Sequence, residues 1–361
     1  GTLSQTTYFV RRAVDPSCGT VYSNVITVTV NNQLNGGSVA SNQTICYNND
    51  VAAFTSSAPA SGGSGTITYT WQYSTTSSTA GSGSWTDIPS SNSLTWDYGA
   101  LSQTTYFVRR ATDPLCGTAY SNVITVTVRP LLTGGSIGAN QTICYNNDVA
   151  PFSSTAPASG GSGAITYTWQ YSTTSAIPGT GSWTSIPSSN SLTWDYGNLT
   201  QTTYFVRRAV DAQCGTVYSN VVTVTVRPQL TGGTIAASQT ICYNNDVAAF
   251  TSSAPASGGS GSVTYTWQYS STTSTPGSGS WTDIPASNSP VWDFGNLTQS
   301  AWFVRRAVDP VCGTVYSNVI LVTVNPQLTG GTIASNQTIC YNNDVAPFTS
   351  TTPASGGSGS V

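Results

Sequence analysis

The chain repeats itself with a period of 98 residues, without insertion or deletion. The period is clearest in the cysteines, which fall into two series named here by their first members. The Cys18 series is Cys18, Cys116, Cys214 and Cys312, and the Cys46 series is Cys46, Cys144, Cys242 and Cys340. A catalytic centre gains little from end-to-end copying, whereas a spacer or a multivalent binder gains reach or avidity with each copy. The repeat therefore predicts tandem domains with a structural or binding role.

The period also sets the domain boundaries that we predict. They are a partial repeat at 1–30, complete repeats at 31–128, 129–226 and 227–324, and a partial repeat at 325–361. Each complete repeat is long enough for one independent domain. Joined head to tail, the partial repeats would still lack the segment equivalent to Tyr69–Gly99, so we do not expect them to complete one domain by strand exchange. We expect the chain to be a section of a longer polypeptide.

The charged residues exclude most kinds of chemistry. All ten basic residues are arginine, all thirteen acidic residues are aspartate, and there is no Lys, Glu, His or Met. Charged residues make up 6% of the chain, against roughly 25% in ordinary globular proteins. Without histidine or lysine, neither a histidine-based catalytic triad nor Schiff-base chemistry can be built. We therefore expect no enzyme activity, no cofactor and no metal. A net charge of −3 also argues against nucleic acid as a partner, and no membrane-inserting segment is visible.

The eight cysteines predict disulfides and an oxidising compartment, because their spacing is strict and none forms a metal-type CxxC pair. The alternative is buried free thiols in a cytosolic protein. We favour bridges within one repeat, since a domain usually completes its own. These would be Cys46–Cys116, Cys144–Cys214 and Cys242–Cys312. The alternative is a bridge between adjacent repeats, such as Cys18–Cys46 and its equivalents, which would stiffen the array.

Hydrophobic alternation indicates strands throughout one repeat. From Ile67 to Tyr73, residues 67, 69, 71 and 73 are apolar or aromatic and fall on one face. No window shows a helical apolar period. The expected strands are Gly37–Ala40 with Gln43–Cys46, Val51–Ser57, Ile67–Tyr73, Trp85–Ile88, Ser93–Asp97, Thr104–Ala111 and Ser121–Val128. About seven short strands separated by Gly, Ser, Pro and Asn turns predict an antiparallel β-sandwich, with Trp71, Trp169 and Trp267 buried.

Several motifs carry a family resemblance. They read QTICYNNDVAAF, YTWQYS, LSQTTYFVRRA and SNVITVTV, with a cysteine between the last two. They resemble tandem immunoglobulin-like (Ig-like) repeats of very large surface proteins of Bacteroidota, many of them exported by the type IX secretion route. The resemblance implies an extracellular rod or fibre of Ig-like antiparallel β-sandwiches in series at the cell surface. Unlike antibody domains, this chain has its cysteines near strand ends rather than in mid-strand.

Two further groups of residues are candidates for binding. Trp85, Trp96 and Tyr98 could stack on sugar rings if they are exposed, or could fill the sandwich core. Asn48, Asn49 and Asp50 could bind calcium, but one carboxylate beside two amides is a poor site. An Asx turn explains these three residues better.

The Arg109–Arg110 pair cannot form one cationic patch, because neighbours in a strand point to opposite faces. We expect one arginine to be solvated and the other to cover an aromatic ring or to pair with an aspartate of the same domain. The alternative is an arginine that reaches an aspartate of a neighbouring chain.

The most specific functional hypothesis is a stalk or fibre section of a giant extracellular bacterial surface protein that presents or spaces an adhesive region. Its partners would be itself, through lateral or end-to-end packing, or cell-surface glycans. The alternative is a multivalent carbohydrate-binding adhesin that uses exposed aromatics. A weaker third class is an ice- or mineral-binding surface made of outward-facing threonines.

Overall fold

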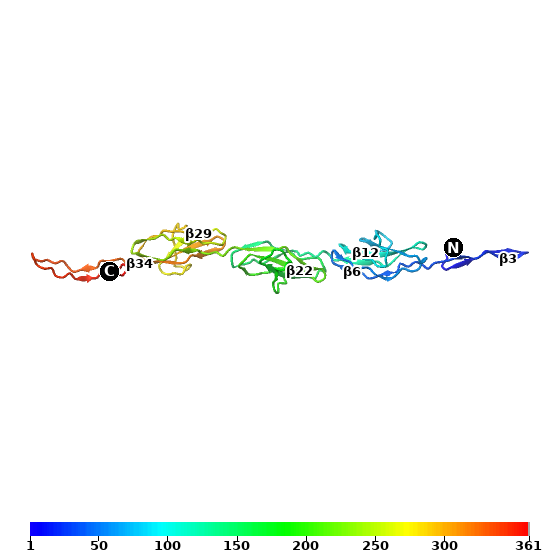
Figure 1. The fold of residues 1–361 in the computed structure, drawn as a ribbon, viewed down its shortest axis with the longest axis horizontal. Helices are drawn as coiled ribbons and strands as arrows, with labels where there is room; N and C mark the ends of the chain where they lie inside the picture. The colour runs from blue at the N-terminus through cyan, green and yellow to red at the C-terminus, as the bar shows by residue number, and fades with distance from the viewer. Residues whose placement is uncertain (360–361) are drawn as a thin grey trace.

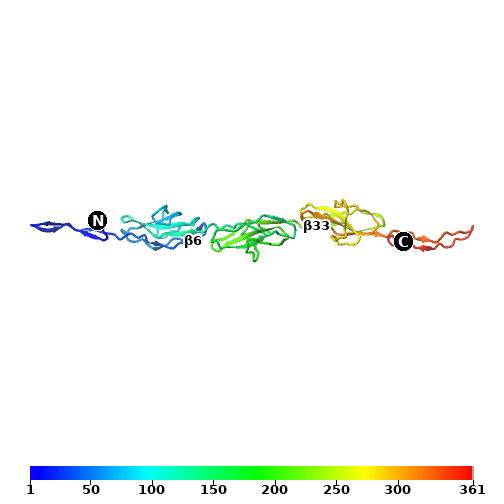
Figure 2. The same ribbon diagram turned by 180° about the vertical axis from the view of Figure 1, so that it is seen from behind.

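The computed structural model describes residues 1–359, and this part of the chain contains strands and no helix. Three complete domains lie in a row, with a partial repeat extending the row at each end (Figure 1). The view from behind shows the same linear arrangement (Figure 2). The described chain therefore has no helix that could traverse a lipid bilayer. The predicted fold class, all-β with sandwich domains in series, is confirmed.

The first complete domain contains one large sheet. Its strand order is β10-β9-β12-β14-β6, and β13 pairs with the far half of β12. The strands are β6 (Gln43–Ile45), β9 (Thr68–Ser74), β10 (Thr86–Asp87), β12 (Thr105–Asp113), β13 (Gly117–Tyr120) and β14 (Ile124–Val128).

The second layer is made of short pieces. They are β5 (Ser38–Val39), β7 (Asn49–Asp50), β8 (Ser56–Ala58) and β11 (Ala100–Leu101). Strand β5 pairs with β8 and β7 pairs with β11, while a single bridge joins Phe54 to Trp96. Neither layer closes on itself, so each domain is an open sandwich.

The other two complete domains repeat this pattern. The second contains β15 (Ser136–Ile137), β16 (Gln141–Ile143), β17 (Asn147–Asp148), β18 (Ser154–Ala156), β19 (Ile165–Ser172), β20 (Thr184–Ser185), β21 (Asn198–Leu199), β22 (Thr203–Asp211), β23 (Gly215–Tyr218) and β24 (Val222–Val226). The third contains β25 (Thr234–Ile235), β26 (Gln239–Cys242), β27 (Asn245–Val247), β28 (Ser252–Ala254), β29 (Thr264–Ser270), β30 (Thr282–Asp283), β31 (Gly295–Leu297), β32 (Ala301–Asp309), β33 (Gly313–Tyr316) and β34 (Ile320–Asn325).

The core of each domain is centred on one tryptophan. Trp71 is fully buried, stacks on Phe54 at 5.5 Å between ring centroids, and donates its indole N–H to the Ser93 carbonyl. Phe107 closes the cluster, 4.6 Å from Phe54. The equivalent Trp169 and Trp267 are also fully buried. The prediction that these three tryptophans form the cores is confirmed.

Two features of the sheet differ from the sequence-based expectation. Strand β6 runs parallel to β14, so the sandwich is not purely antiparallel. Strand β13, which the sequence analysis did not identify, forms a hairpin with β12. The turn of that hairpin contains Gly117 at a φ of 84°, a backbone conformation that glycine adopts without strain.

The partial repeats keep only some of these strands. The first holds β1 (Thr7–Phe9), β2 (Arg12–Asp15), β3 (Gly19–Tyr22) and β4 (Ile26–Val28), and the last holds β35 (Thr332–Ile333) and β36 (Ser350–Thr352). Strand β1 pairs with β4, β2 with β3, and β35 with β36. The first partial repeat thus contains only strand pairs of the large sheet, and the last contains only one strand pair of the second layer.

Candidate functional site

Disulfides cross the junctions between consecutive domains. Cys46 of the first domain is bonded to Cys214 of the second, and Cys144 of the second is bonded to Cys312 of the third. In both bonds the Cα atoms lie 5.5 Å apart, within the range for unstrained disulfides. Each bond therefore joins a Cys46-series residue to a Cys18-series residue of the next complete repeat, 168 residues further along.

The predicted pairing within one repeat is therefore wrong. Cys46, Cys144, Cys214 and Cys312 are bonded, but to other partners than expected, whereas Cys116 and Cys242 are free. The reason is the parallel pairing of β6 with β14. Cys116 precedes β13 and β14, while Cys46 follows β6 beside the far end of β14. A dozen extended residues span roughly 40 Å, so the two cysteines of one domain lie at opposite poles.

The alternative pairing, Cys18–Cys46, is also wrong, although its idea of a bond between neighbouring domains is correct. Cys18 and Cys340 are both free in the structure. Cys46 faces the domain that follows it, whereas Cys18 belongs to the repeat that precedes it. Strand β3, which begins directly after Cys18, lies beyond one end of the first complete domain, and β6, which ends directly before Cys46, is labelled near the other end of that domain (Figure 1).

One half of each junction is a tight turn, which we call the pole turn. In the second domain it comprises Cys144–Asn147, directly after β16. Asn146 has a φ of 59°, a conformation that asparagine tolerates better than most residues. The Asn147 amide donates to the Cys144 carbonyl over 3.1 Å. The tetrapeptide Tyr-Asn-Asn-Asp thus lies in a turn, as expected, but a backbone hydrogen bond rather than an Asx side chain closes it. In the part of the chain that the structure describes, no three His, Cys, Asp or Glu side chains lie together.

The other half is the turn of the β22–β23 type, which we call the pole hairpin. Asp211 at its base is buried, and its Oδ1 accepts the backbone N–H groups of Gln213 and Cys214. Its Oδ2 accepts the backbone N–H and the hydroxyl of Ser162. Gly161 lies against this carboxylate at a φ of 60°, where a Cβ atom would sit 2.7 Å from Oδ2. Asp211 therefore fixes the hairpin that carries Cys214.

The hydrogen bond from the Ser162 hydroxyl lowers the pKa of Asp211 to about 2. Burial opposes the shift, and the backbone donors of Cys214 and Gln213 reinforce it. Hydrogen bonds to an ionised carboxylate stabilise its charged form, which is the reason for the direction of the shift.

The peptide linker contacts both domains that it joins. At the first junction, the Arg129 amide donates to the Ile45 carbonyl of the first domain, and the Gly161 amide of the second domain donates to the Pro130 carbonyl. Each junction therefore has two connections, a hydrogen-bonded linker and a disulfide.

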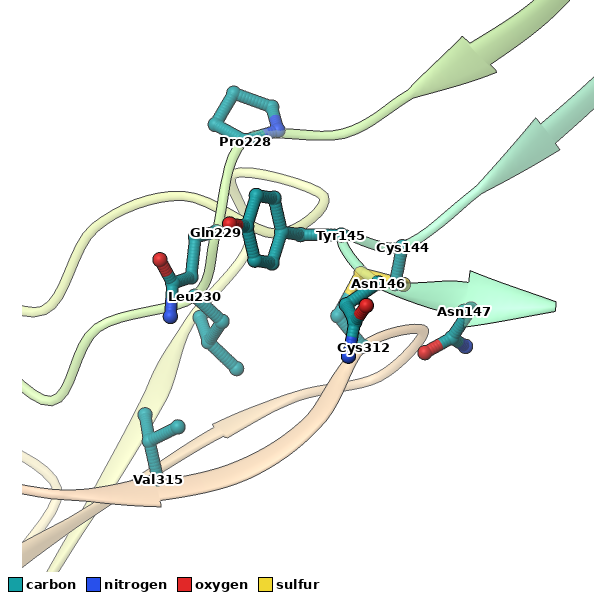
Figure 3. A pocket seen from close by; sticks show the side chains of 9 residues that line it. All are labelled: Cys144, Tyr145, Asn146, Asn147, Pro228, Gln229, Leu230, Cys312 and Val315. Carbon is teal, nitrogen blue, oxygen red and sulfur yellow. A yellow bond between two sulfur atoms is a disulfide. The ribbon is translucent and has the colours of Figure 1, made fainter. Parts of the chain in front are cut away.

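A small pocket of about 290 Å³ lies at the second junction. Figure 3 shows the Cys144–Cys312 bond at its edge, with Tyr145 of the pole turn facing the linker residues Gln229 and Leu230. Val315 of the following domain completes the wall. Apart from Tyr145, no ionisable group lines the pocket, which lies between the pole turn, the linker and the following domain.

The arginine pair separates as strand geometry requires. Arg109 is fully buried and lies over the Tyr69 ring at 4.8 Å. Arg110, on the opposite face, forms an ion pair with Asp87 of the same domain at 2.9 Å. Both arginines therefore have partners within their own domain, and the alternative, an arginine that pairs with an aspartate of a neighbouring chain, is not needed to account for either side chain.

Sequence analysis did not anticipate the extent to which Arg109 is enclosed. Its guanidinium donates to the second layer at the Ser56 hydroxyl and to the carbonyls of Gly36, Ala58 and Leu94. Burial lowers the pKa of Arg109, and the Tyr69 ring opposes this shift. The side chain therefore connects the two layers without a carboxylate partner.

The three aromatic candidates for sugar stacking divide into two groups. Trp96 and Tyr98 pack against the buried core of their domain, and Tyr98 makes an edge contact with Phe107 at 4.8 Å. Trp85 is half-buried on a loop, where its indole N–H binds the Thr79 carbonyl. Stacking on a sugar stays a prediction, which the geometry favours most for Trp85.

Comparison with known proteins places the repeat in a family. The family model described as "Domain of unknown function (DUF8696)" matches residues 35–130, 133–228 and 231–326. No curated protein matches the chain.

Among solved structures, the chain is similar to an I-band fragment of titin at 11% identity and a TM-score of 0.43, covering 78% of this chain and 95% of that one. It is also similar to extracellular domains 3–5 of Drosophila OTK at 10% identity and a TM-score of 0.30, covering 81% and 97%. Three N-terminal domains of the highly immunogenic outer capsid protein of bacteriophage RB49 match at 12% identity and 0.30, covering 80% and 97%.

Proposed function

The chain belongs to the family of the domain of unknown function DUF8696, with three of its domains in tandem, and we propose that it is a load-bearing section of an extracellular stalk or fibre. In this role the repeats hold an adhesive region away from a bacterial cell surface. The proposal rests on one observation above all, the disulfides that cross both junctions between complete domains.

These bonds change the route that tension takes along the chain. In a tandem array joined only by peptide bonds, tension passes through the whole backbone of every domain and can unfold each in turn. Here the Cys46–Cys214 bond bypasses 168 residues, which hides roughly 550–600 Å of contour length. Load that enters the first domain reaches the second through Ser38–Cys46 alone, a segment that already consists largely of strand.

The two bonds overlap along the sequence, because Cys144 lies inside the segment that Cys46 and Cys214 enclose. The third domain is protected in the same way as the first, since tension that arrives at Cys312 leaves through β33 and β34. The first domain is therefore bypassed, whereas the second stays in the load path, because Cys214 is connected to Cys312 only through residues 144–214 and the second bond or through residues 214–312. A stalk that keeps its length under shear gains from such bypassed domains.

The composition supports the same role. Disulfides form and persist in oxidising environments such as the cell exterior. The surface is rich in Ser, Thr, Asn and Gly, and its low charge gives little self-repulsion between rods packed side by side. The absence of His, Glu and Lys leaves few groups for catalysis, so the proposed function is not enzymatic.

The test is to pull single molecules of the full chain from both ends under oxidising conditions and after reduction. We expect whole-domain unfolding steps of about 300 Å only after reduction. In the oxidised chain, any step is limited by the 70 residues from Cys144 to Cys214 (214 − 144), which span at most roughly 230–250 Å. The Cys46→Ser/Cys144→Ser variant should give these steps in both conditions, which makes it the matched control. Whole-domain steps in the oxidised wild-type chain would contradict the proposal.

A second candidate function is multivalent glycan binding, which the half-exposed Trp85 and its equivalents Trp183 and Trp281 favour. Their 98-residue spacing would place one aromatic side chain on each domain of the row. Direct measurement of glycan binding by the chain with all three tryptophans changed to alanine decides this alternative, because a true stacking site would lose its affinity.

A further inference from the structure

A carboxylate is held on the outer face of the first domain's large sheet, the face turned away from the tryptophan core. Asp87 of β10 accepts hydrogen bonds from the Arg110 guanidinium over 3.0 and 2.9 Å and from the Gln72 side-chain amide over 2.6 Å. Gln72 and Arg110 belong to the neighbouring strands β9 and β12. Three hydrogen bonds from two strands therefore converge on one carboxylate, and we call these two donor side chains the carboxylate cradle.

The third domain repeats this arrangement, and the second does not. In the third domain, Asp283 accepts a hydrogen bond from Arg306 over 3.0 Å and forms an ion pair with it. The second domain has Ser185 at the equivalent position, but it keeps both residues of the carboxylate cradle, as Gln170 and Arg208. The cradle of the second domain is therefore present without the carboxylate that it holds in the other two.

Arg208 is left without an acidic partner. It forms no ion pair with any residue from 1 to 359, although the second domain contains Asp148, Asp195 and Asp211. Its Nε atom is buried and has no hydrogen-bond partner, while the side chain as a whole is only partly exposed. A guanidinium that is partly withdrawn from water is stabilised by an anion, because it can donate two parallel hydrogen bonds to a carboxylate.

The serine leaves space for a carboxylate and adds a donor. Ser185 is exposed, and its side chain is shorter than that of aspartate. Its hydroxyl oxygen accepts the Gln170 side-chain amide over 3.1 Å. Because a hydroxyl group donates as well as accepts, the hydroxyl hydrogen of Ser185 is available to an acceptor outside the chain. A ligand carboxylate in this space receives hydrogen bonds from both Arg208 and Ser185.

Aromatic side chains border the same space. Trp183 precedes Ser185 by two residues, so strand alternation puts both side chains on one face, roughly 7 Å apart along the strand. Gly179, in the loop before Trp183, lies against the Tyr218 ring, where a Cβ atom would sit 3.4 Å from it. Tyr218 is in turn the register partner of Arg208 in the sheet. An indole or phenol face can stack on a sugar ring, which favours a sugar over a polypeptide as the source of the carboxylate.

We propose that the second domain binds an acidic polysaccharide at its carboxylate cradle. The carboxylate of a uronic acid unit takes the place that Asp87 occupies in the first domain, bonded to Arg208 and Ser185, and a neighbouring unit lies against Trp183. This site goes beyond the load-bearing function and does not depend on it. It also differs from the glycan-binding alternative above, which expects an equal site on every domain, because Asp87 and Asp283 already fill the cradles of the other two.

The test titrates a linear oligogalacturonate, a chain of uronic acid units, into the full-length protein. Its methyl ester, which lacks the charge, is the matched control ligand. Isothermal titration calorimetry gives both the affinity and the number of sites. We expect one site per chain, and affinity for the methyl ester that is weaker by about tenfold or more, because the ester cannot accept charge-assisted hydrogen bonds from Arg208.

Two full-length variants change the site in opposite directions. Ser185→Asp fills the cradle with a carboxylate of the chain itself, as in the first domain, and should weaken binding by about tenfold or more. Asp87→Ser opens the cradle of the first domain and should raise the number of sites from one to two. Both positions are exposed, and an unchanged circular dichroism spectrum verifies that both variants are folded.

Several results would overturn the inference: no binding by the wild type, equal affinity for the methyl ester, unchanged binding in Ser185→Asp, or a single site in Asp87→Ser. Sedimentation velocity without ligand tests the other source of a carboxylate. Self-association that is lost in Arg208→Gln would assign the cradle to an aspartate of a second copy and so overturn the polysaccharide assignment. The pulling experiment does not involve Arg208, so a failure here leaves the load-bearing function to its own test.

Discussion

At the scale of single residues, Arg109 is the most informative side chain of the first domain. It is fully buried in the sheet that contains β12, and it reaches across to the second layer at Ser56 and Ala58. The guanidinium of Arg109 also lies over the face of the Tyr69 ring, and this cation–π contact stabilises its positive charge. Carbonyl and hydroxyl oxygens accept hydrogen bonds from Nη1 and Nη2, which helps to offset the cost of burying the cation without a carboxylate partner, whereas Nε has no hydrogen-bond partner.

We predict that Arg109→Met lowers the free energy of unfolding of the first domain by about 3 kcal/mol, because it leaves buried carbonyl groups without a hydrogen-bond donor. The neighbouring Arg110→Met should cost less than about 1 kcal/mol, because the ion pair with Asp87 lies near solvent. Native-state hydrogen exchange of β9 measures both, and β29 of the unchanged third domain is the internal control. Equal losses in the two variants would contradict this account.

At the scale of elements, the pole hairpin and the pole turn are the units that make a junction. The hydrogen bonds that hold the pole hairpin do not depend on the disulfide, since the Cys18 hairpin has them while its cysteine is unbonded. Strands β16 and β24 then hold turn and hairpin at opposite poles of one domain, because the two strands run parallel. The elements therefore act between domains rather than within one.

The stability of the pole hairpin in the second domain should depend on pH in a defined acidic range. The pKa of Asp211 lies at about 2 in the folded chain, below its ordinary value of 3.8, so unfolding takes up a proton. The stabilisation is fully present above about pH 4 and is lost as the pH falls toward 2. We expect the protection factors of the amides in β22 and β23, which are corrected for the intrinsic exchange rate at each pH, to fall over this range in the wild type and to lose most of that dependence in Asp211→Asn. The exposed Asp148→Asn is the control, and an unchanged pH profile in Asp211→Asn would refute the assignment.

At the scale of the whole molecule, the overlapping disulfides make one covalent framework of three domains. A disulfide at each junction restrains bending, because the linker alone could act as a hinge. The hydrogen bonds of the linker, such as that from Arg129 to Ile45, are weaker than a covalent connection. The two bonded junctions also have the same direction, since in each a pole turn faces the pole hairpin of the following domain.

We predict that Cys46→Ser/Cys214→Ser gives a chain that bends at the first junction while the second stays straight. Small-angle X-ray scattering should show a shorter mean end-to-end distance and a broader distance distribution than for the wild type. Cys18→Ser removes a thiol that is free in the structure and should leave the scattering unchanged. Identical curves for all three chains would show that the linkers alone keep the rod straight.

The sequence by itself determined the repeat, the all-β class and the buried tryptophans, because each depends on local patterns. A Tyr-x-Trp-x-Tyr alternation selects a half-buried strand wherever it occurs. The division of Arg109 and Arg110 between two faces also follows from strand geometry alone.

Only the tertiary structure decided the disulfide partners and the surroundings of Arg109, Trp96 and Tyr98. Spacing along the chain does not reveal that β6 lies parallel to β14, and that pairing sends Cys46 to the pole opposite Cys116. Which cysteines meet depends on contacts between residues far apart in sequence and between separate domains. The feature that carries the proposed function therefore arises from the arrangement of the domains, and the sequence supplied only the periodic positions of its cysteines.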